Sequence, residues 1–342
     1  MPDISRRDFF RWLLAGVGTL AGGWFLRACG VQMAPTPLPP QATRTPLPPT
    51  ATPTLVPGAP TPTPAPTALP TPTPPPLPDL AVARGGEPAD LVQRAIAALG
   101  GMERFVRPGD DVIVKPNICV AYHSYEYAAT TNPWVVGALV TMCREAGAAR
   151  VRVMDLPFGG STEEAYAVSG IQEQVVAAGG EMERMTSLKY VPADMSMALD
   201  LRSCDIYEDV LNADVVISVH IAKHHGLARL TLGMKNLMGV IRNRQAIHRN
   251  MGQRLADLTA RIRPALTVVD AVRILTANGP TGGDLADVQK LDTVIASPDI
   301  VSADAFAATL FGLQPGDLDY VRAAAEMGLG RMDLENLRIA EV

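Results

Sequence analysis

Cysteine is scarce in this sequence, and its spacing argues against two common uses of the residue. The four cysteines stand at positions 29, 119, 143 and 204, so three remain beyond position 29 and none forms a Cys-x-x-Cys motif. Disulfide frameworks use paired cysteines, and protein-bound iron–sulfur clusters use closely spaced ones. We therefore expect neither a disulfide scaffold nor a cluster held by this chain alone. Cys119 is either a small buried apolar residue or a neighbour of a site near Lys115.

Positive charge is not in excess either. The chain has 30 basic and 35 acidic residues, which gives a formal net charge of −5 at pH 7. A protein that binds the phosphate backbone of a nucleic acid needs a basic face. Nucleic acid is therefore not expected as a partner, and any site for an anion must be local.

A long apolar run is missing as well. The apolar stretch over residues 12–26 has about 15 residues, short of the about 20 that a membrane-spanning helix needs. The residues before it, 5–10 (Ser-Arg-Arg-Asp-Phe-Phe), resemble a twin-arginine export signal. Leu-Arg-Ala-Cys at 26–29 resembles a lipobox, with Arg27 as a departure, and makes Cys29 the candidate lipidation site. The alternative is a leader that is uncleaved or conventionally cleaved, with an incidental cysteine.

Proline is concentrated in one segment. Of the 30 prolines, 19 lie between Pro35 and Pro78, among threonines and almost no charged residues. Such a composition leaves nothing to pack and favours an extended backbone. We expect a leader at 1–30, a disordered Pro/Thr-rich linker at 31–78 and an α/β domain at 79–342. The protein would use the twin-arginine translocase and lie at the extracytoplasmic face of the cell membrane, held by a lipid anchor or by the leader.

The folded part alternates short β-branched runs with helical periodicity, which predicts an α/β domain with a mostly parallel, helix-covered sheet. The run beginning at Val215 organises the domain, because it is followed by a polar cluster, His220 to His225. Asp155 and Asp270 are expected at strand exits, and 206–211 is expected to be helical. The other expected strands are 80–83, 112–114, 150–154, 265–269 and 293–296, and the expected helices are 89–99, 134–146, 253–262 and 302–310.

Lysine is rare, and its positions suggest a function. The chain has five lysines against 25 arginines, and Lys115, Lys223 and Lys235 stand in apolar surroundings. Lysine carries a compact charge, and its pKa falls when the side chain is buried. It can therefore hold a phosphate or carboxylate, act as a base or form a Schiff base. Four of the five histidines lie between 220 and 248. Because neighbours in an extended segment point to opposite sides, His225 is preferred over His224 as the ligand-facing residue.

These residues define a candidate site. Lys115, Lys223 and Lys235 would clamp an anionic small molecule, and His225 or His248 would be the general base or a metal ligand. Lys115 and Lys235 could instead form structural ion pairs with Asp155 and Asp270. No His-x-x-x-His spacing occurs, so a metal is left open and the cofactor is unknown. The expected catalytic residues are Lys115, Lys223, His225, Lys235 and His248, and the expected ligand-binding residues are Asn117, Thr130, Thr131, Asp155, Asn236, Asp270 and Asn278.

The order and spacing of these motifs resemble the bacterial and archaeal family called domain of unknown function 362. The resemblance runs from about residue 112 to 339 and includes Lys-Pro-Asn at 115–117, Thr-Thr-Asn-Pro at 130–133 and Lys-Asn-Leu at 235–237. The family commonly has Pro-Lys-x-Lys-Thr-His where this chain has His-Ile-Ala-Lys-His-His at 220–225. Many members also carry a ferredoxin-like module, which is absent here. The spacing from Lys235 to His248 loosely resembles the lactate racemase family, in which a lysine anchors a nickel cofactor.

The sequence thus favours an exported, membrane-tethered enzyme that acts on or with an anionic small ligand in a Lys/His/Asp site. A tethered anion-binding or solute-binding protein without catalysis is the alternative. A metal-dependent redox or racemase-like enzyme is a lesser alternative. Substrate, reaction and oligomeric state are left open.

Overall fold

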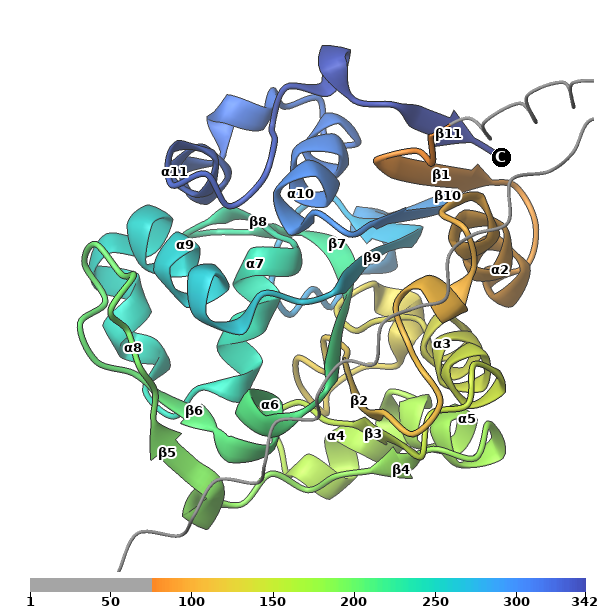
Figure 1. The fold of residues 1–342 in the computed structure, drawn as a ribbon, viewed down its shortest axis with the longest axis horizontal. Helices are drawn as coiled ribbons and strands as arrows, with labels where there is room; N and C mark the ends of the chain where they lie inside the picture. The colour runs from red at the N-terminus through yellow and green to blue at the C-terminus, as the bar shows by residue number, and fades with distance from the viewer. Residues whose placement is uncertain (1–75) are drawn as a thin grey trace, which may run out of the picture. The chain divides into compact units, whose positions relative to one another are not determined.

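A computed structural model describes residues 76–342. The predicted leader, Cys29 and almost all of the predicted linker lie outside the described residues. The described part is an α/β fold with one large, mostly parallel sheet and helices on both of its faces (Figure 1). The predicted fold class is therefore confirmed. No helix in residues 76–342 is long and apolar enough to cross a bilayer.

The large sheet has the strand order β11-β1-β10-β9-β7-β2-β3-β4, and a short strand, β8, pairs with β7. A separate small sheet is formed by β5 and β6. The strands are β1 (Leu80–Arg84), β2 (Asp111–Lys115), β3 (Arg150–Val153), β4 (Glu181–Met182), β5 (Tyr190–Pro192), β6 (Asp205–Tyr207), β7 (Val215–His225), β8 (Arg229–Thr231), β9 (Leu266–Leu275), β10 (Val288–Ser297) and β11 (Ile339–Glu341).

Strand direction follows from the connections. β2, β3, β4, β7 and β9 run parallel to their neighbours among these strands, with β7 at the centre between β2 and β9. Strand β10 is antiparallel to both β9 and β1. It is joined to β9 without a crossover, by residues 276–287, which include the short 3-10 helix η6 (Leu285–Asp287). A direct connection of this kind gives an antiparallel pair, whereas a parallel pair needs a crossover.

Two helical layers cover the sheet, and the alternation of strand side chains supplies a core for each. Val112 and Val114 of β2 pack into one core, and Ile113 between them packs into the other. The first layer contains α2 (Pro88–Ala98), α3 (Pro133–Glu145), α4 (Thr162–Val168) and α5 (Ile171–Ala177). The second contains α6 (Glu208–Asn212), α7 (Gly233–Asn236), α8 (Arg244–Ile247), α9 (Met251–Ile262), α10 (Ile300–Thr309) and α11 (Asp319–Glu326).

Two strands are longer than the sequence predicts, and this moves polar residues from loops into the sheet. β7 continues through the polar cluster to His225, because its last residues pair with β8 as a hairpin. β9 continues to Leu275, because its ladder with β10 extends that far. Asp270 is therefore in the middle of a strand and not at its exit. The predicted helix at 206–211 was partly wrong, since β6 occupies residues up to Tyr207.

Candidate functional site

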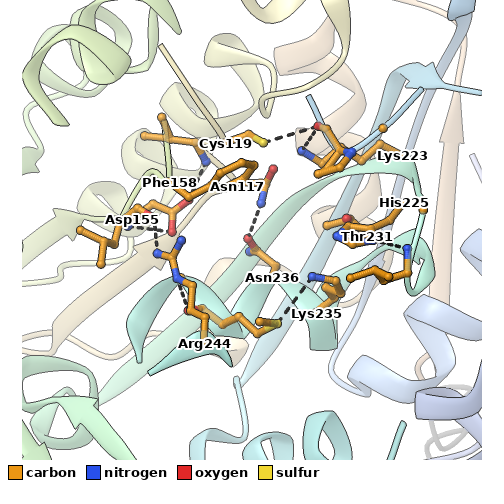
Figure 2. Close-up of a pocket in the computed structure, with 18 of the residues that line it drawn as sticks. Asn117, Cys119, Asp155, Phe158, Lys223, His225, Thr231, Lys235, Asn236 and Arg244 are labelled. Carbon is orange, nitrogen blue, oxygen red and sulfur yellow. Dashed lines mark hydrogen bonds between the residues drawn. The ribbon is translucent and has the colours of Figure 1, made fainter. Parts of the chain in front are cut away.

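A cavity of about 420 Å³ opens where β2, β3 and β7 end, the edge at which parallel α/β sheets usually bind ligands. Its walls come from the loops after β2 and β3, from the β7–β8 hairpin, from α7 and η4 (Leu237–Val240), from α8, and from the β9–β10 connection. The charged and titratable side chains of its lining are Cys119, Asp155, Lys223, His225, Lys235, Arg244 and His248 (Figure 2).

Lys115 lies beneath this cavity and does not line it. Its Nζ donates to Asp155 Oδ1 at 2.8 Å, to Asn236 Oδ1 at 2.9 Å and to the Pro116 carbonyl at 2.7 Å. All three of its donors are thus used. Burial lowers the pKa of Lys115 to about 8, and the Asp155 carboxylate opposes this shift. The expected ion pair with Asp155 is present, and Lys115 acts as a scaffold for the site.

Two amide side chains connect Lys115 to the cavity wall through hydrogen bonds. Asn236 accepts Lys115 Nζ through its Oδ1, and its Nδ2 donates to the Lys115 carbonyl at 3.1 Å, which sets the orientation of its amide. The same Oδ1 accepts Asn117 Nδ2 at 3.1 Å. The Oδ1 of Asn117 therefore points away from Asn236 (Figure 2), and it is buried without a hydrogen-bond partner in the structure. Asn117 thus lines the cavity with a fixed amide whose buried Oδ1 is unpaired among the described residues.

Lys223 approaches the cavity from β7. Its Nζ donates to the carbonyls of Ala129 at 2.5 Å and of Pro280 at 2.9 Å, and no carboxylate of residues 76–342 pairs with it. Two of its three donors are used by these carbonyls, and the Cys119 side chain lies within reach of the third. Cys119 Sγ contacts the same Pro280 carbonyl at 3.4 Å. Burial lowers the pKa of Lys223.

Lys235 is the most weakly satisfied charged group of the cavity. It is 9% exposed, and its single hydrogen-bond partner within residues 76–342 is Met238 Sδ at 3.5 Å, a weak acceptor. The predicted alternative, an ion pair with Asp270, is absent from the described residues. Burial, with the charge of Lys223 next in effect, lowers the pKa of Lys235 to about 8. An amine in this state can exchange a proton near neutral pH.

His225 lines the cavity, and hydrogen bonds to its Nδ1 fix the tautomer of its neutral ring. Its Nδ1 accepts the backbone N–H groups of Leu227 at 3.0 Å and Ala228 at 3.2 Å, so the neutral ring carries its proton on Nε2. Burial, with the charge of Lys235 next in effect, lowers the pKa of His225 to about 3. The structure thus favours a neutral hydrogen-bond donor over the expected general base. The preference for His225 over His224 fits the geometry, since His224 Nδ1 accepts the Gly279 N–H instead.

His248 and Arg244 lie at the α8 side of the cavity. His248 is exposed, and its Nδ1 lies 3.3 Å from Gln245 Oε1. Burial of the ring, followed by the charge of Lys235, lowers the pKa of His248. Arg244 donates to the carbonyls of Met238 and Leu156 and pairs with no carboxylate in the described chain. Sequence reasoning missed Arg244, although the basic run at 241–248 was a signal.

Four predicted ligand-binding residues do not line the cavity. Asp270 is buried in β9 and accepts the backbone N–H groups of Asn132 at 2.7 Å and Val272 at 3.1 Å, and burial raises its pKa to about 7. Thr131 is bonded to the Asn117 N–H and to the backbone of β7. These contacts order the loop after β2, which explains why such polar residues are buried. The four residues are Thr130, Thr131, Asp270 and Asn278.

Metal ligation was left open, and the described geometry gives it no obvious centre. No group of three His, Cys, Asp or Glu side chains within residues 76–342 lies close enough together to hold a metal ion. The imidazoles of His225 and His248 and the thiol of Cys119 line the same cavity, so they are the side chains from which any ligand set would have to be drawn.

Comparison with known proteins places this site in a family. The chain is 28% identical over 240 residues to the thylakoid-associated protein sll1697 of Synechocystis sp.. The matched region covers 68% of this chain and 72% of that protein. Among solved structures, the lactate racemase apoprotein of Thermoanaerobacterium thermosaccharolyticum matches at 13% identity with a TM-score of 0.43, covering 67% of this chain. A Thermotoga maritima protein matches at 12% identity with a TM-score of 0.36, also covering 67% of this chain. The chain spans 56% and 60% of the lengths of those two structures.

The sequence model of the family described as "Domain of unknown function (DUF362)" matches residues 112–309, which is more than half of the chain and contains every residue of the cavity lining. The chain therefore belongs to the DUF362 family.

Proposed function

We propose that the protein is an enzyme that binds a small anionic molecule in this cavity and catalyses transfer of a proton to or from that molecule. The observation that carries the proposal is the unbalanced charge of the lining. Lys223, Lys235 and Arg244 have no carboxylate partner in residues 76–342, and the one carboxylate of the lining, Asp155, is already paired with Lys115. Buried charges are costly unless they are paired. A ligand carboxylate or phosphate would supply the missing partner.

The remaining groups suggest a division of roles. Lys235, whose pKa lies at about 8, can take a proton from the ligand or give one to it. The neutral His225 would donate a hydrogen bond from its Nε2–H to a ligand oxygen on which negative charge develops. Lys223, with one donor not taken by a carbonyl, would hold the anionic group. His248 at the exposed side is a second candidate for proton exchange with solvent.

The test combines binding with exchange of hydrogen. Thermal shift of the full chain would be measured with inorganic phosphate and with a panel of carboxylic acids. Every acid that binds would then be incubated in D₂O and examined by NMR for deuterium at carbon. Lys235→Met should lose both signals. Lys290→Met is the matched control, because this lysine is exposed and paired with Asp292 at 2.9 Å.

The outcomes separate two classes of protein. Deuterium incorporation that needs Lys235 supports the enzyme. Binding that needs Lys235 without any incorporation would support the alternative, a tethered protein that binds an anion and does not convert it. Binding and exchange that are equal in wild type and Lys235→Met would contradict both.

We further propose that the protein is exported through the twin-arginine translocase and tethered at the extracytoplasmic face of the membrane. The proposal is supported by the twin-arginine-like residues 5–10, by the lipobox-like Cys29 and by the Pro/Thr-rich spacer. The Synechocystis relative is named for an association with a membrane system. Labelling with radioactive palmitate in the native host tests the anchor. Cys29→Ser should abolish the label, and Arg6→Lys with Arg7→Lys should leave the protein in the cytoplasm.

A further inference from the structure

Two large apolar side chains of the cavity lining are exposed, beside the exposed polar residues Gln245 and His248. Phe158, in the loop after β3, is 58% exposed, and Leu227, in the β7–β8 turn, is 71% exposed. Both residues line the same cavity. A single exposed apolar side chain is ordinary on a protein surface, but exposed apolar residues that converge on one opening are typical of a binding site.

The cavity changes character from its mouth inward. The ammonium-bearing residues are buried, with Lys223 1% and Lys235 9% exposed, whereas the two rim residues are more than half exposed. The lining contains further apolar side chains that are buried, among them Ile118 and Met238. The two lysine charges thus lie deep, in a cavity whose lining is largely apolar.

We infer that the anionic ligand of this cavity is an amphiphile, whose carboxylate or phosphate is held by Lys223 and Lys235 and whose hydrocarbon part extends along the apolar wall to Phe158 and Leu227. This inference rests on the proposed function for the anionic end and adds the class of molecule. Charge complementarity places the head group at Lys223 and Lys235, because these lysines are buried without a carboxylate partner in residues 76–342, whereas Phe158 and Leu227 are apolar. Burial of hydrocarbon against the wall then favours a ligand with a chain over a compact anion.

A chain-length series tests the inference. Isothermal titration calorimetry on the full chain at pH 7 would use straight-chain carboxylates and alkyl phosphates with four, six, eight and ten carbons. Burial of one methylene contributes about 0.8 kcal/mol, which corresponds to an about fourfold lower Kd per added carbon until the chain passes the rim. A Kd that stays constant along both series would overturn the inference and leave the proposed function intact. Failure of every member to bind would overturn both.

Variants of the rim give the second readout. In Phe158→Ser with Leu227→Ser, the affinity for the ten-carbon ligand relative to the four-carbon ligand should fall about tenfold or more. Leu188→Ser is the matched control, because Leu188 is 91% exposed and lies in η3 (Ser187–Lys189), outside the cavity lining. An unchanged ratio of the two affinities in the double variant would show that Phe158 and Leu227 do not contact the hydrocarbon of the ligand, and would overturn the inferred path.

Discussion

Replacement of Lys235 by methionine should stabilise the protein at neutral pH while removing ligand binding. In the folded chain the pKa of Lys235 is lowered to about 8 from its ordinary 10.5, mainly by burial. Each pKa unit corresponds to about 1.4 kcal/mol, so holding the protonated amine in this cavity costs about 3 kcal/mol at pH 7. Methionine has a similar length and no charge, so the variant avoids this cost.

The pH dependence separates this cause from general effects of the substitution. The unfolded chain binds a proton at position 235 more tightly than the folded chain does. The penalty is therefore fully present below about pH 8, fades as the pH rises, and is gone above about 10.5. The variant should exceed wild type in free energy of unfolding by about 3 kcal/mol at pH 7 and by about 1 kcal/mol at pH 10.

Urea unfolding of the ligand-free full chain at both pH values measures the two differences. In a thermal melt at pH 7 the gain should appear as a rise in Tm of about 6–12 °C. A variant less stable than wild type at pH 7, or a difference that does not change between pH 7 and pH 10, would refute the reasoning. The first result would mean that Lys235 has a stabilising partner, and the second that its amine is not desolvated.

Three further predictions concern the scaffold and the ligand. Lys115→Met removes one half of the buried pair with Asp155 and should destabilise the protein by about 3–5 kcal/mol in urea unfolding; a loss below 1 kcal/mol would contradict the pair's structural role. Gly239→Ala should cost at least about 2 kcal/mol, because its Cβ would lie 1.9 Å from Asp155 Oδ1. Gly316→Ala, with nothing within 4 Å, is the control and should change stability by less than about 0.5 kcal/mol. Anion affinity should fall by up to about tenfold per unit as the pH rises above 8, since Lys235 loses its proton; an affinity constant from pH 7 to pH 10 would argue against its role.

Much of the fold could be predicted from the sequence because its signals are local. The β-branched runs at 112–114 and 150–154 correspond to β2 and β3, and the segments with helical periodicity at 89–99, 134–146 and 253–262 correspond to α2, α3 and α9. Strand ends were predicted less well. β7 and β9 extend beyond their apolar runs because they are paired with β8 and β10, and a pairing partner is not visible in the strand's own residues.

The candidate site could also be predicted only in part. Rare lysines in apolar segments were a signal that a single sequence carries, and the structure brings Lys223, Lys235 and His225 to one cavity. The position of Lys115 one layer below, with all its donors used, depends on Asp155 and Asn236 from other segments. The donor role of His225 depends on two backbone N–H groups in the turn that follows it, which its residue type alone does not reveal.

The amino-acid sequence by itself determined which segments become strands and helices and which charged residues are surrounded by apolar ones, because both are set by neighbours along the chain. Tertiary structure decided which of those charges are neutralised. Lys115 is paired with Asp155, which follows β3 and lies 40 residues away in the sequence, whereas the partner of Lys235 within residues 76–342 is only the thioether of Met238. Pairing of a buried charge depends on what the fold places within about 3 Å of it, and that distance is settled when the sheet and its helices pack together.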